Sequence, residues 1–344
     1  MNLQEKLILF ILLVIPVCFI AMHCASSKPN PPSKPVVAQG ETQQGTGESP
    51  VKDAGEANEE VVRLSRIPDV LRIAYVPSVE AGTVVERTDD LDKALSEKLG
   101  IPVKSTIIQN YVMAVEGLGS GQFDCAMLSP LGYVLGKQRY PIEPLVQVKR
   151  ENATQYQGQI IVNVDSGIKT IADLKGHTFA FVDQVSTSGH LYARVLMLEN
   201  GLDIMKDIKN GPVFVGSHDK VAVDVMHGTV DAGATFNDVR ERVKDKYPEV
   251  MEKTRIIALT EPIPNENFSV SSDLDLGFRE KLKSALIEIS RGVTVGLELK
   301  RPFYDMGKID ELVPVTDADY NGVRDIIKRL DFDLLSEVRK VTGQ

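Results

Sequence analysis

The feature that most constrains the fold is an alternation of short apolar runs with segments of helical spacing, which begins near residue 63. Runs 71–76, 103–107 and 123–128 have the length and residue types of buried strands. The segments between them have helical periodicity, and Pro130 stands where a further helix begins. This β-α-β-α-β succession predicts a mostly parallel sheet with helices on both faces.

The same alternation restarts further along the chain. Strand-like runs lie at 159–164, 178–182, 213–215, 231–235 and 255–259, helical segments at 171–174, 188–200 and 219–227, and helices dominate 276–295 and 317–341. Two α/β lobes fit this order better than one continuous sheet, with a return crossing near 262–272. We expect lobe 1 at 63–158 plus 268–344, lobe 2 at 159–267, two hinge crossings, and a ligand cleft between the lobes.

The N-terminus predicts export from the cytoplasm. A charged start is followed by an apolar run, 7–22, that is shorter than the ~20 residues of a comfortable membrane span and contains Pro16. We interpret residues 1–23 as a signal peptide. Cys24, followed by small polar residues, resembles the lipidated cysteine of bacterial lipoproteins, although Ala21 and His23 depart from that pattern. An ordinary signal peptide or an uncleaved anchor, with Cys24 incidental, are the alternatives.

The next segment predicts a flexible tether. Residues 24–62 are rich in Pro, Gly, Ser, Gln, Glu and Lys and contain no aromatic residue. Such a composition cannot bury enough apolar surface to offset the entropy lost on ordering. We therefore expect a disordered spacer between a membrane anchor and the folded part.

Cysteine usage and charge exclude several classes of protein. Only Cys125 lies in the part expected to fold, so no internal disulfide is possible, and its apolar surroundings predict a buried thiol. The formal net charge is −9 and no basic stripe is present, which argues against nucleic acid as a partner. No Walker A loop, His-Glu-x-x-His motif or paired-cysteine metal site occurs, and we expect no cofactor or metal.

The strongest chemical signal is a turn between a strand and a helix. The apolar run ending at Val182 leads into Ser186, Thr187 and Ser188, and Gly189 follows. Hydroxyl groups at a helix start cap free N–H groups, or together with them surround an oxyanion. Capping needs one hydroxyl, so three in a row favour the anion site, with capping alone as the alternative.

Further strand-to-helix turns carry polar side chains. His218, beside Gly and Ser, has an imidazole N–H to offer an oxyanion. Asp238 suits a ligand with a P–OH proton or an amino group, or alternatively caps the next helix. In the first lobe, Tyr111 and Ser129 each stand where a helix is expected to begin, and we expect them to close the opposite side of the ligand.

At this point the segment from about 73 to 266 resembles the substrate-binding subunits of phosphate/phosphite/phosphonate ABC importers. The matching motifs agree in order and spacing and are Tyr111 with 115–118, then 121–124, 129–133, 173–176, 186–189, 216–219 and 231–234. The hydroxyl run 186–189 after a strand is the most specific of them. The resemblance implies a two-lobed periplasmic binding protein of type II fold.

The resemblance also implies a ligand site. Its residues would be Tyr111, Ser129, Ser186, Thr187, Ser188, His218, Asp238 and Glu266. Asp238 and Glu266 would stand where aminophosphonate binders of the family place acidic residues. An aspartate is common where Glu266 stands, and some members have an aromatic residue at Leu128, so the identity of the ligand stays open.

The implied function is capture of a phosphorus oxyanion (phosphate, phosphite or a phosphonate) for ABC import, by a monomer in the cell envelope. Its partners would be an ABC permease and a lipid anchor. One alternative is a sensor domain that reports ligand to a membrane protein. The other is a hydrolase built on Ser188, His218 and Asp238, but the Gly-x-Ser-x-Gly elbow of such enzymes is missing.

Overall fold

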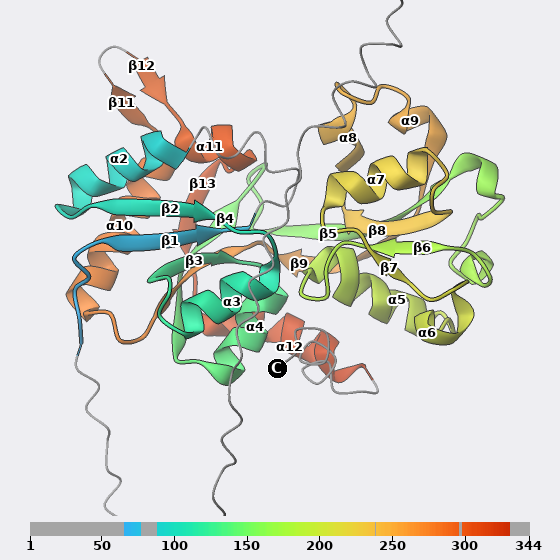
Figure 1. The fold of residues 1–344 in the computed structure, drawn as a ribbon, viewed down its shortest axis with the longest axis horizontal. Helices are drawn as coiled ribbons and strands as arrows, with labels where there is room; N and C mark the ends of the chain where they lie inside the picture. Colours follow the sequence, from blue (N-terminus) through green and yellow to red (C-terminus); the bar gives the residue numbers. More distant parts are fainter. Residues whose placement is uncertain (1–64, 77–87, 238, 296–297, 331–344) are drawn as a thin grey trace, which may run out of the picture. The chain divides into compact units, whose positions relative to one another are not determined.

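The computed structural model describes residues 65–76, 88–237, 239–295 and 298–330 (Figure 1). The chain divides into two units, 1–60 and 61–344, and all described residues belong to the second. The signal peptide, Cys24, the tether and Asp238 therefore lie outside the described residues. Within the described residues, no helix has both the length and the apolar character needed to cross a membrane.

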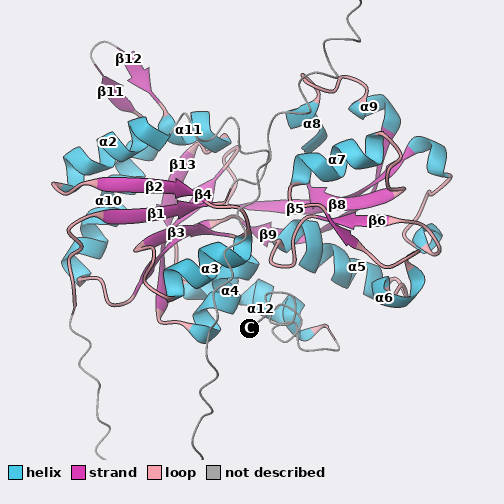
Figure 2. Ribbon diagram, in the orientation of Figure 1, coloured by secondary structure: helices cyan, strands magenta, loops and turns pink. Residues whose placement is uncertain are grey.

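Lobe 1 is built on a mixed sheet of six strands within the described residues, in the order β13-β4-β10-β3-β1-β2. The strands are β1 (Leu71–Tyr75), β2 (Val103–Ile107), β3 (Cys125–Leu128), β4 (Ile142–Lys149), β10 (Asn267–Ser271) and β13 (Glu311–Pro314). β1 pairs in parallel with both β2 and β3, whereas β10 is antiparallel to β3 and β4. Helices cover both faces of this sheet (Figure 2).

The helices of lobe 1 divide between the two faces. They are α2 (Thr88–Leu99), α3 (Tyr111–Gly119), α4 (Pro130–Arg139), α10 (Leu276–Ser290), α11 (Pro302–Gly307) and α12 (Asn321–Lys328), and a hairpin of β11 (Val293–Val295) and β12 (Glu298–Lys300) is appended. Apolar side chains of α2, α10 and α11 pack in one core cluster. Those of α3, α4 and α12 pack in another, on the face where the site lies.

Lobe 2 has a sheet of five strands in the described residues, in the order β7-β6-β8-β5-β9. Its elements are β5 (Gln155–Asn163), β6 (Phe179–Phe181), η5 (Thr187–Tyr192), α5 (Ala193–Glu199), α6 (Ile204–Asp207), β7 (Val213–Phe214), α7 (His218–Met226), β8 (Ala232–Phe236), α8 (Val239–Val243), α9 (Val250–Lys253) and β9 (Thr254–Pro264). β6 is buried along its whole length because helices cover both faces of the sheet.

Three sequence-based expectations need correction. The first sheet is mixed and not mostly parallel, because β4, β10 and β13 run antiparallel to their neighbours, and β4, β10 and β13 were all missed as strands. The strand expected at 159–164 is longer and runs from Gln155 to Asn163. Residues 293–295 form a strand and not the end of a helix, because Gly292 adopts a positive φ of 117° that ends α10 and the β-branched Val-Thr-Val run follows.

A buried ion-pair cluster fixes the start of lobe 1. The Asp124 carboxylate, fully buried at the start of β3, accepts hydrogen bonds from the backbone N–H and Nε of Arg72, both at 2.9 Å. Arg66 Nη1 lies 2.7 Å from the other carboxylate oxygen. Burial works to raise the pKa of Asp124, but the two guanidinium groups outweigh it and hold the pKa below its usual range.

Candidate oxyanion-binding site

The centre of the candidate site is the turn after β6, where the chain enters the π-helix η5. Ser186, Thr187 and Ser188 are each only 1 % exposed. Ser186 caps η5, because its Oγ accepts a hydrogen bond from the backbone N–H of Gly189 at 3.1 Å. A Cβ atom on Gly189 would lie 2.4 Å from Val182 Cγ2, so this turn requires glycine. Single-turn π-helices are frequent at functional sites.

Each of the three hydroxyl groups accepts a hydrogen bond from the protein. Leu131 N–H donates to Thr187 Oγ1 at 2.9 Å, and Tyr156 O–H donates to Ser188 Oγ at 3.3 Å. Because each of these bonds uses a lone pair of the hydroxyl oxygen, it leaves the hydroxyl proton available for donation. This is the arrangement that suits binding of an oxyanion, which has acceptors only.

Ser129 behaves differently from the other hydroxyl residues. Its Oγ donates its only proton to the carbonyl of Val185 at 2.9 Å and accepts from Gly132 N–H at 3.0 Å, as the N-cap of α4. Val185 precedes the hydroxyl turn in lobe 2, and Ser129 belongs to lobe 1. The hydroxyl of Ser129 therefore joins the two lobes beside the site, in parallel with the bond from Leu131 to Thr187.

His218 supplies a neutral nitrogen donor. Its ring lies at the first residue of α7, 3 % exposed, and Nδ1 accepts a hydrogen bond from Phe236 N–H at 3.1 Å. Burial lowers the pKa of His218 to about 3, so the imidazole is uncharged at neutral pH. Because a neutral imidazole has one proton and Nδ1 is an acceptor here, the proton resides on Nε2.

We expect His218 to act without titrating between pH 5 and 8. Affinities of the native protein and of His218→Asn are measured for one ligand across that range, and their ratio is followed so that ionisation of the ligand cancels. The ratio should be flat, because the donor on Nε2 is present at every pH well above the lowered pKa of about 3. A ratio that changes about the ordinary histidine pKa near 6.5 would contradict this assignment.

Tyr111 and Glu266 reach the same pocket from the other side. Tyr111 is the first residue of α3, whose N-cap Asn110 accepts from Met113 N–H at 2.9 Å. Burial, followed by the charge of Glu266, raises the pKa of the Tyr111 phenol well above its usual value, so it stays a neutral donor. Glu266 follows β9 and forms an ion pair with Arg150, whose Nη1 lies 2.7 Å from Glu266 Oε2.

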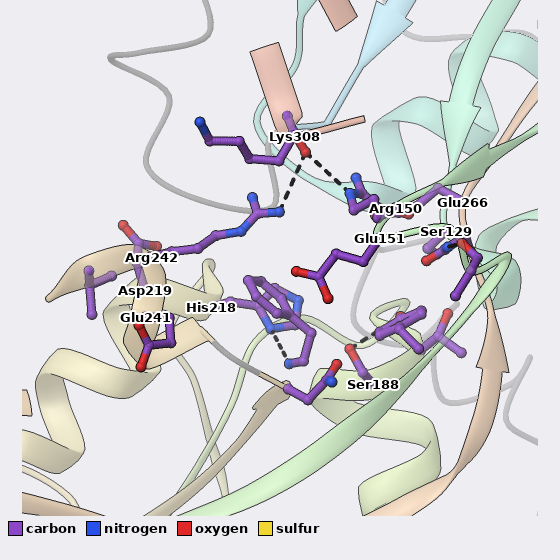
Figure 3. Close-up of a pocket in the computed structure, with 18 of the residues that line it drawn as sticks. Ser129, Arg150, Glu151, Ser188, His218, Asp219, Glu241, Arg242, Glu266 and Lys308 are labelled. Carbon is purple, nitrogen blue, oxygen red and sulfur yellow. Dashed lines mark hydrogen bonds and ion pairs between the residues drawn. The ribbon is translucent and has the colours of Figure 1, made fainter. Parts of the chain in front are cut away.

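These residues line one cavity of about 1100 Å³. Of the residues expected from sequence, the cavity brings together Tyr111, Ser129, Ser186, Thr187, Ser188, His218 and Glu266. Figure 3 shows Arg150 next to Glu266, with Ser188 and His218 on the facing part of the wall. Asp238 lies outside the described residues, although its neighbour Asn237 lines the cavity.

Several lining residues were not anticipated, among them Arg150, Glu151, Arg242 and Lys308. Arg150 and Arg242 both donate to the carbonyl of Gly307, at 3.2 and 3.4 Å (Figure 3). For Arg150 and Glu151 a signal was present in the sequence, because the charged run 149–151 directly follows an apolar stretch. This run lies where the chain crosses from β4 to β5.

The geometry favours binding over catalysis. His218 Nδ1 accepts from a backbone N–H and Ser188 Oγ accepts from Tyr156, so neither is engaged with the other as nucleophile and base. Within the described residues, no group of three or more His, Cys, Asp and Glu side chains is placed to hold a metal ion. At its centre the site offers neutral hydroxyl and imidazole donors, with charged side chains such as Arg150 and Arg242 further along the wall of a cleft between two α/β lobes. That combination defines a solute-binding protein of the periplasmic type.

Comparison with known proteins identifies the family. The family of periplasmic substrate-binding proteins of phosphonate ABC transporters matches residues 73–320, and the chain belongs to it. A phosphate-import protein, PhnD, of Mycolicibacterium smegmatis is 27 % identical over 278 residues, which cover 75 % of this chain and 85 % of the relative. A probable phosphite-binding protein, PhnD1, of Prochlorococcus marinus is 24 % identical over 272 residues, or 77 % and 91 % of the two chains.

Solved structures agree with the type II periplasmic binding fold. PhnD1 of Prochlorococcus marinus in complex with methylphosphonate superposes with a TM-score of 0.68 at 23 % identity, covering 77 % of this chain and 99 % of that one. A binding protein of a phosphonate ABC transporter from Pseudomonas aeruginosa superposes with a TM-score of 0.66 at 20 % identity. The match covers 75 % of this chain and 85 % of that one. As a family member, the protein is a substrate-binding component and not an enzyme. It acts outside the cytoplasm, with a small-molecule ligand and a membrane permease as its partner.

Proposed function

We propose that this protein captures a small phosphorus oxyanion, namely phosphate, phosphite or a simple phosphonate, and delivers it to its permease. The observation that carries the proposal is the convergence of three buried hydroxyl groups and the neutral His218 donor on one cavity. Such groups donate to an anion without bringing a counter-charge, and each bond to a charged acceptor is about twice as strong as a neutral one. The names of the relatives from Mycolicibacterium smegmatis and Prochlorococcus marinus support the same ligand class.

We propose that binding closes the two lobes, lobe 1 and lobe 2, about the two chain crossings. One crossing lies between β4 and β5, at 150–154, and the other between β9 and β10, at 265–266. Hinges of this kind are a few residues at the ends of elements that absorb the backbone change. The hydrogen bonds from Ser129 to Val185 and from Leu131 to Thr187 belong to the closed form.

We propose that Cys24 carries a lipid anchor and that the protein works as a monomer tethered to the membrane. The support is the sequence around Cys24 and the tether composition of residues 24–62. Membrane fractionation of cells that produce the native chain or Cys24→Ser tests the anchor. Release of the variant alone into the soluble fraction is the expected result, and equal distribution of the two chains would refute it.

Isothermal titration with phosphate, phosphite, methylphosphonate and 2-aminoethylphosphonate tests the function directly. Sulfate serves as the matched oxyanion of another element. We expect tight binding of at least one of the first three ligands and much weaker binding of sulfate. Because the donors proposed to contact the ligand, the buried hydroxyl groups and His218, are uncharged, the affinity should change little between low and high salt. If none of the phosphorus compounds binds, the proposed function is wrong.

A further inference from the structure

A carboxylate stands in the wall of this anion pocket. Glu266 lines the cavity, and its side chain is 19 % exposed. The charge of Glu266 acts on two tyrosines of the site. Burial is the largest cause that raises the pKa values of Tyr111 and Tyr156, and the negative charge of Glu266 is the second. A carboxylate so placed would by itself repel an oxyanion and attract an ammonium group.

Arg150 cancels this charge. Its Nη1 donates to Glu266 Oε2 at 2.7 Å, and its side chain is 21 % exposed. Burial works to raise the pKa of Glu266, but the charge and the hydrogen bond of Arg150 outweigh it and hold the pKa below its usual range. The pair is therefore ionised on both sides and nearly neutral in sum, as seen from a ligand at the hydroxyl turn.

Hydrogen bonds hold the Arg150 side chain in this position. Its backbone forms a bridge with Ala153, and the two residues between them, Glu151 and Asn152, have positive φ values of 49° and 62°. Arg150 Nε also donates to the carbonyl of Gly307 at 3.2 Å. Two side-chain hydrogen bonds, to Glu266 and to Gly307, thus hold the guanidinium beside Glu266. The left-handed backbone of Glu151 and Asn152 is that of a two-residue turn, which positions the backbone of Arg150 next to Ala153.

We propose that Arg150 is a specificity-determining residue, which neutralises Glu266 so that the pocket accepts phosphorus oxyanions with an uncharged substituent in preference to those that carry an ammonium group. The inference rests on the proposed function and narrows its ligand class. An ammonium group beside the Arg150–Glu266 pair loses hydration and finds no net negative charge in that pair in return, although Glu151, Asp219 and Glu241 also line the cavity. A hydrogen, hydroxyl or alkyl substituent loses far less.

The test compares two ligands that differ in one ammonium group, ethylphosphonate and 2-aminoethylphosphonate, by isothermal titration of the full chain at neutral pH. The native protein should bind ethylphosphonate more tightly. In Arg150→Met the carboxylate of Glu266 loses its hydrogen-bonded counter-charge and keeps only the more remote charge of Arg242, so the ratio of the two affinities should shift toward 2-aminoethylphosphonate by about tenfold. The interaction of two unit charges at an effective dielectric near 20 reaches a tenfold effect out to about 12 Å.

A double-mutant cycle separates charge from structure. Glu266→Gln should keep the native preference for ethylphosphonate, and Arg150→Met combined with Glu266→Gln should return the ratio close to the native value, because neither charge is left. Lys149→Met is the matched control. Lys149 is the preceding residue, pairs with Glu311 at 3.6 Å and does not line the cavity, so its loss should leave both affinities unchanged. Arg150→Gln, which keeps a donor for Gly307, replaces the methionine variant if thermal melting shows that the latter does not fold.

The outcomes are distinguishable. If Arg150→Met weakens both ligands by the same factor, Arg150 has a structural role and the inference is overturned while the proposed function stands. A native preference for 2-aminoethylphosphonate would overturn it equally. If the native protein binds neither phosphonate and no other phosphorus oxyanion, the proposed function fails first and the inference falls with it.

Discussion

Replacing Thr187 by valine should weaken binding of the phosphorus oxyanion by about a hundredfold or more, with the fold retained. Valine has nearly the same shape, so the core around the turn keeps its packing. It lacks the proton that threonine donates to the ligand, and hydrogen bonds to charged groups contribute about 1.5–3 kcal/mol. It also lacks the oxygen that accepts from Leu131 N–H at 2.9 Å.

Loss of the hydrogen bond to the ligand and loss of the acceptor for Leu131 N–H both destabilise the closed, ligand-bound form. In the closed form Leu131 N–H is buried and would stay unpaired, which costs about 1–3 kcal/mol, whereas water satisfies it when the lobes open. The two terms together amount to about 3 kcal/mol or more, and each 1.4 kcal/mol is a factor of ten in the dissociation constant.

Isothermal titration of Thr187→Val against the ligand that the native protein binds best measures this effect. Thr170→Val is the control, since Thr170 is an exposed threonine of the same lobe whose Oγ1 donates to Asp173 and which does not line the cavity. The control should bind as the native protein does. Unchanged affinity in Thr187→Val would remove the hydroxyl turn from the site.

Replacing Asp124 by asparagine should lower the free energy of unfolding by about 2–4 kcal/mol at pH 7. Asp124 is fully buried, and its carboxylate neutralises the guanidinium groups of Arg66 and Arg72. Removal of one partner from a buried pair costs about 3–5 kcal/mol. Here the loss falls mainly on Arg72, because Arg66 also pairs with Asp273 at 2.8 Å. Arg66 and Arg72 remain 34 % and 42 % exposed, so water offsets part of that loss.

The effect should depend on pH. Because the pKa of Asp124 is lowered on folding, the ionised carboxylate stabilises the fold fully at pH values above its unfolded pKa near 3.9. This contribution is lost as the pH falls through the lower, folded pKa. The difference between the native protein and Asp124→Asn is therefore full at pH 7 and shrinks in acid.

Urea unfolding at pH 7 and near pH 3 measures both claims. Asp69→Asn is the matched control, because Asp69 is an exposed aspartate near the same end of lobe 1, and its substitution should change the unfolding free energy by less than about 0.5 kcal/mol. Equal losses in the two variants, or a loss at Asp124 that is the same at both pH values, would show that the ion pairs do not stabilise the start of lobe 1 as described.

Much of the candidate site was predictable because its parts are local in sequence. A buried strand followed by a short turn with Ser186, Thr187 and Ser188 places those hydroxyls beyond the carboxyl edge of a sheet. The same holds for His218 at the start of α7 and Tyr111 at the start of α3. Capping and turn geometry act over three or four residues, and a sequence displays such distances directly.

The pairing of Arg150 with Glu266 was not predictable in that way. The two residues are separated by 116 positions and meet only because both chain crossings run beside the cavity. From the sequence alone, Glu266 is expected to pair with an ammonium group of the ligand, and its ion pair with Arg150 is the reason for proposing the opposite preference. β4, β10 and β13 escaped prediction for a related reason, since an antiparallel strand in a mixed sheet is identified by its neighbours more than by its own residues.

The sequence by itself determined the two α/β lobes, the turns that carry donors and the family to which the chain belongs, because periodicity, caps and motif spacing are properties of neighbouring residues. Only the tertiary structure decided how those turns combine. It gave the proton of Ser129 to the carbonyl of Val185, aligned Thr187 to accept from Leu131, and set Arg150 against Glu266. Which charges pair and which groups share a hydrogen bond depends on distances in space. Those distances follow from the order of the strands in the sheets, and no local sequence pattern encodes that order.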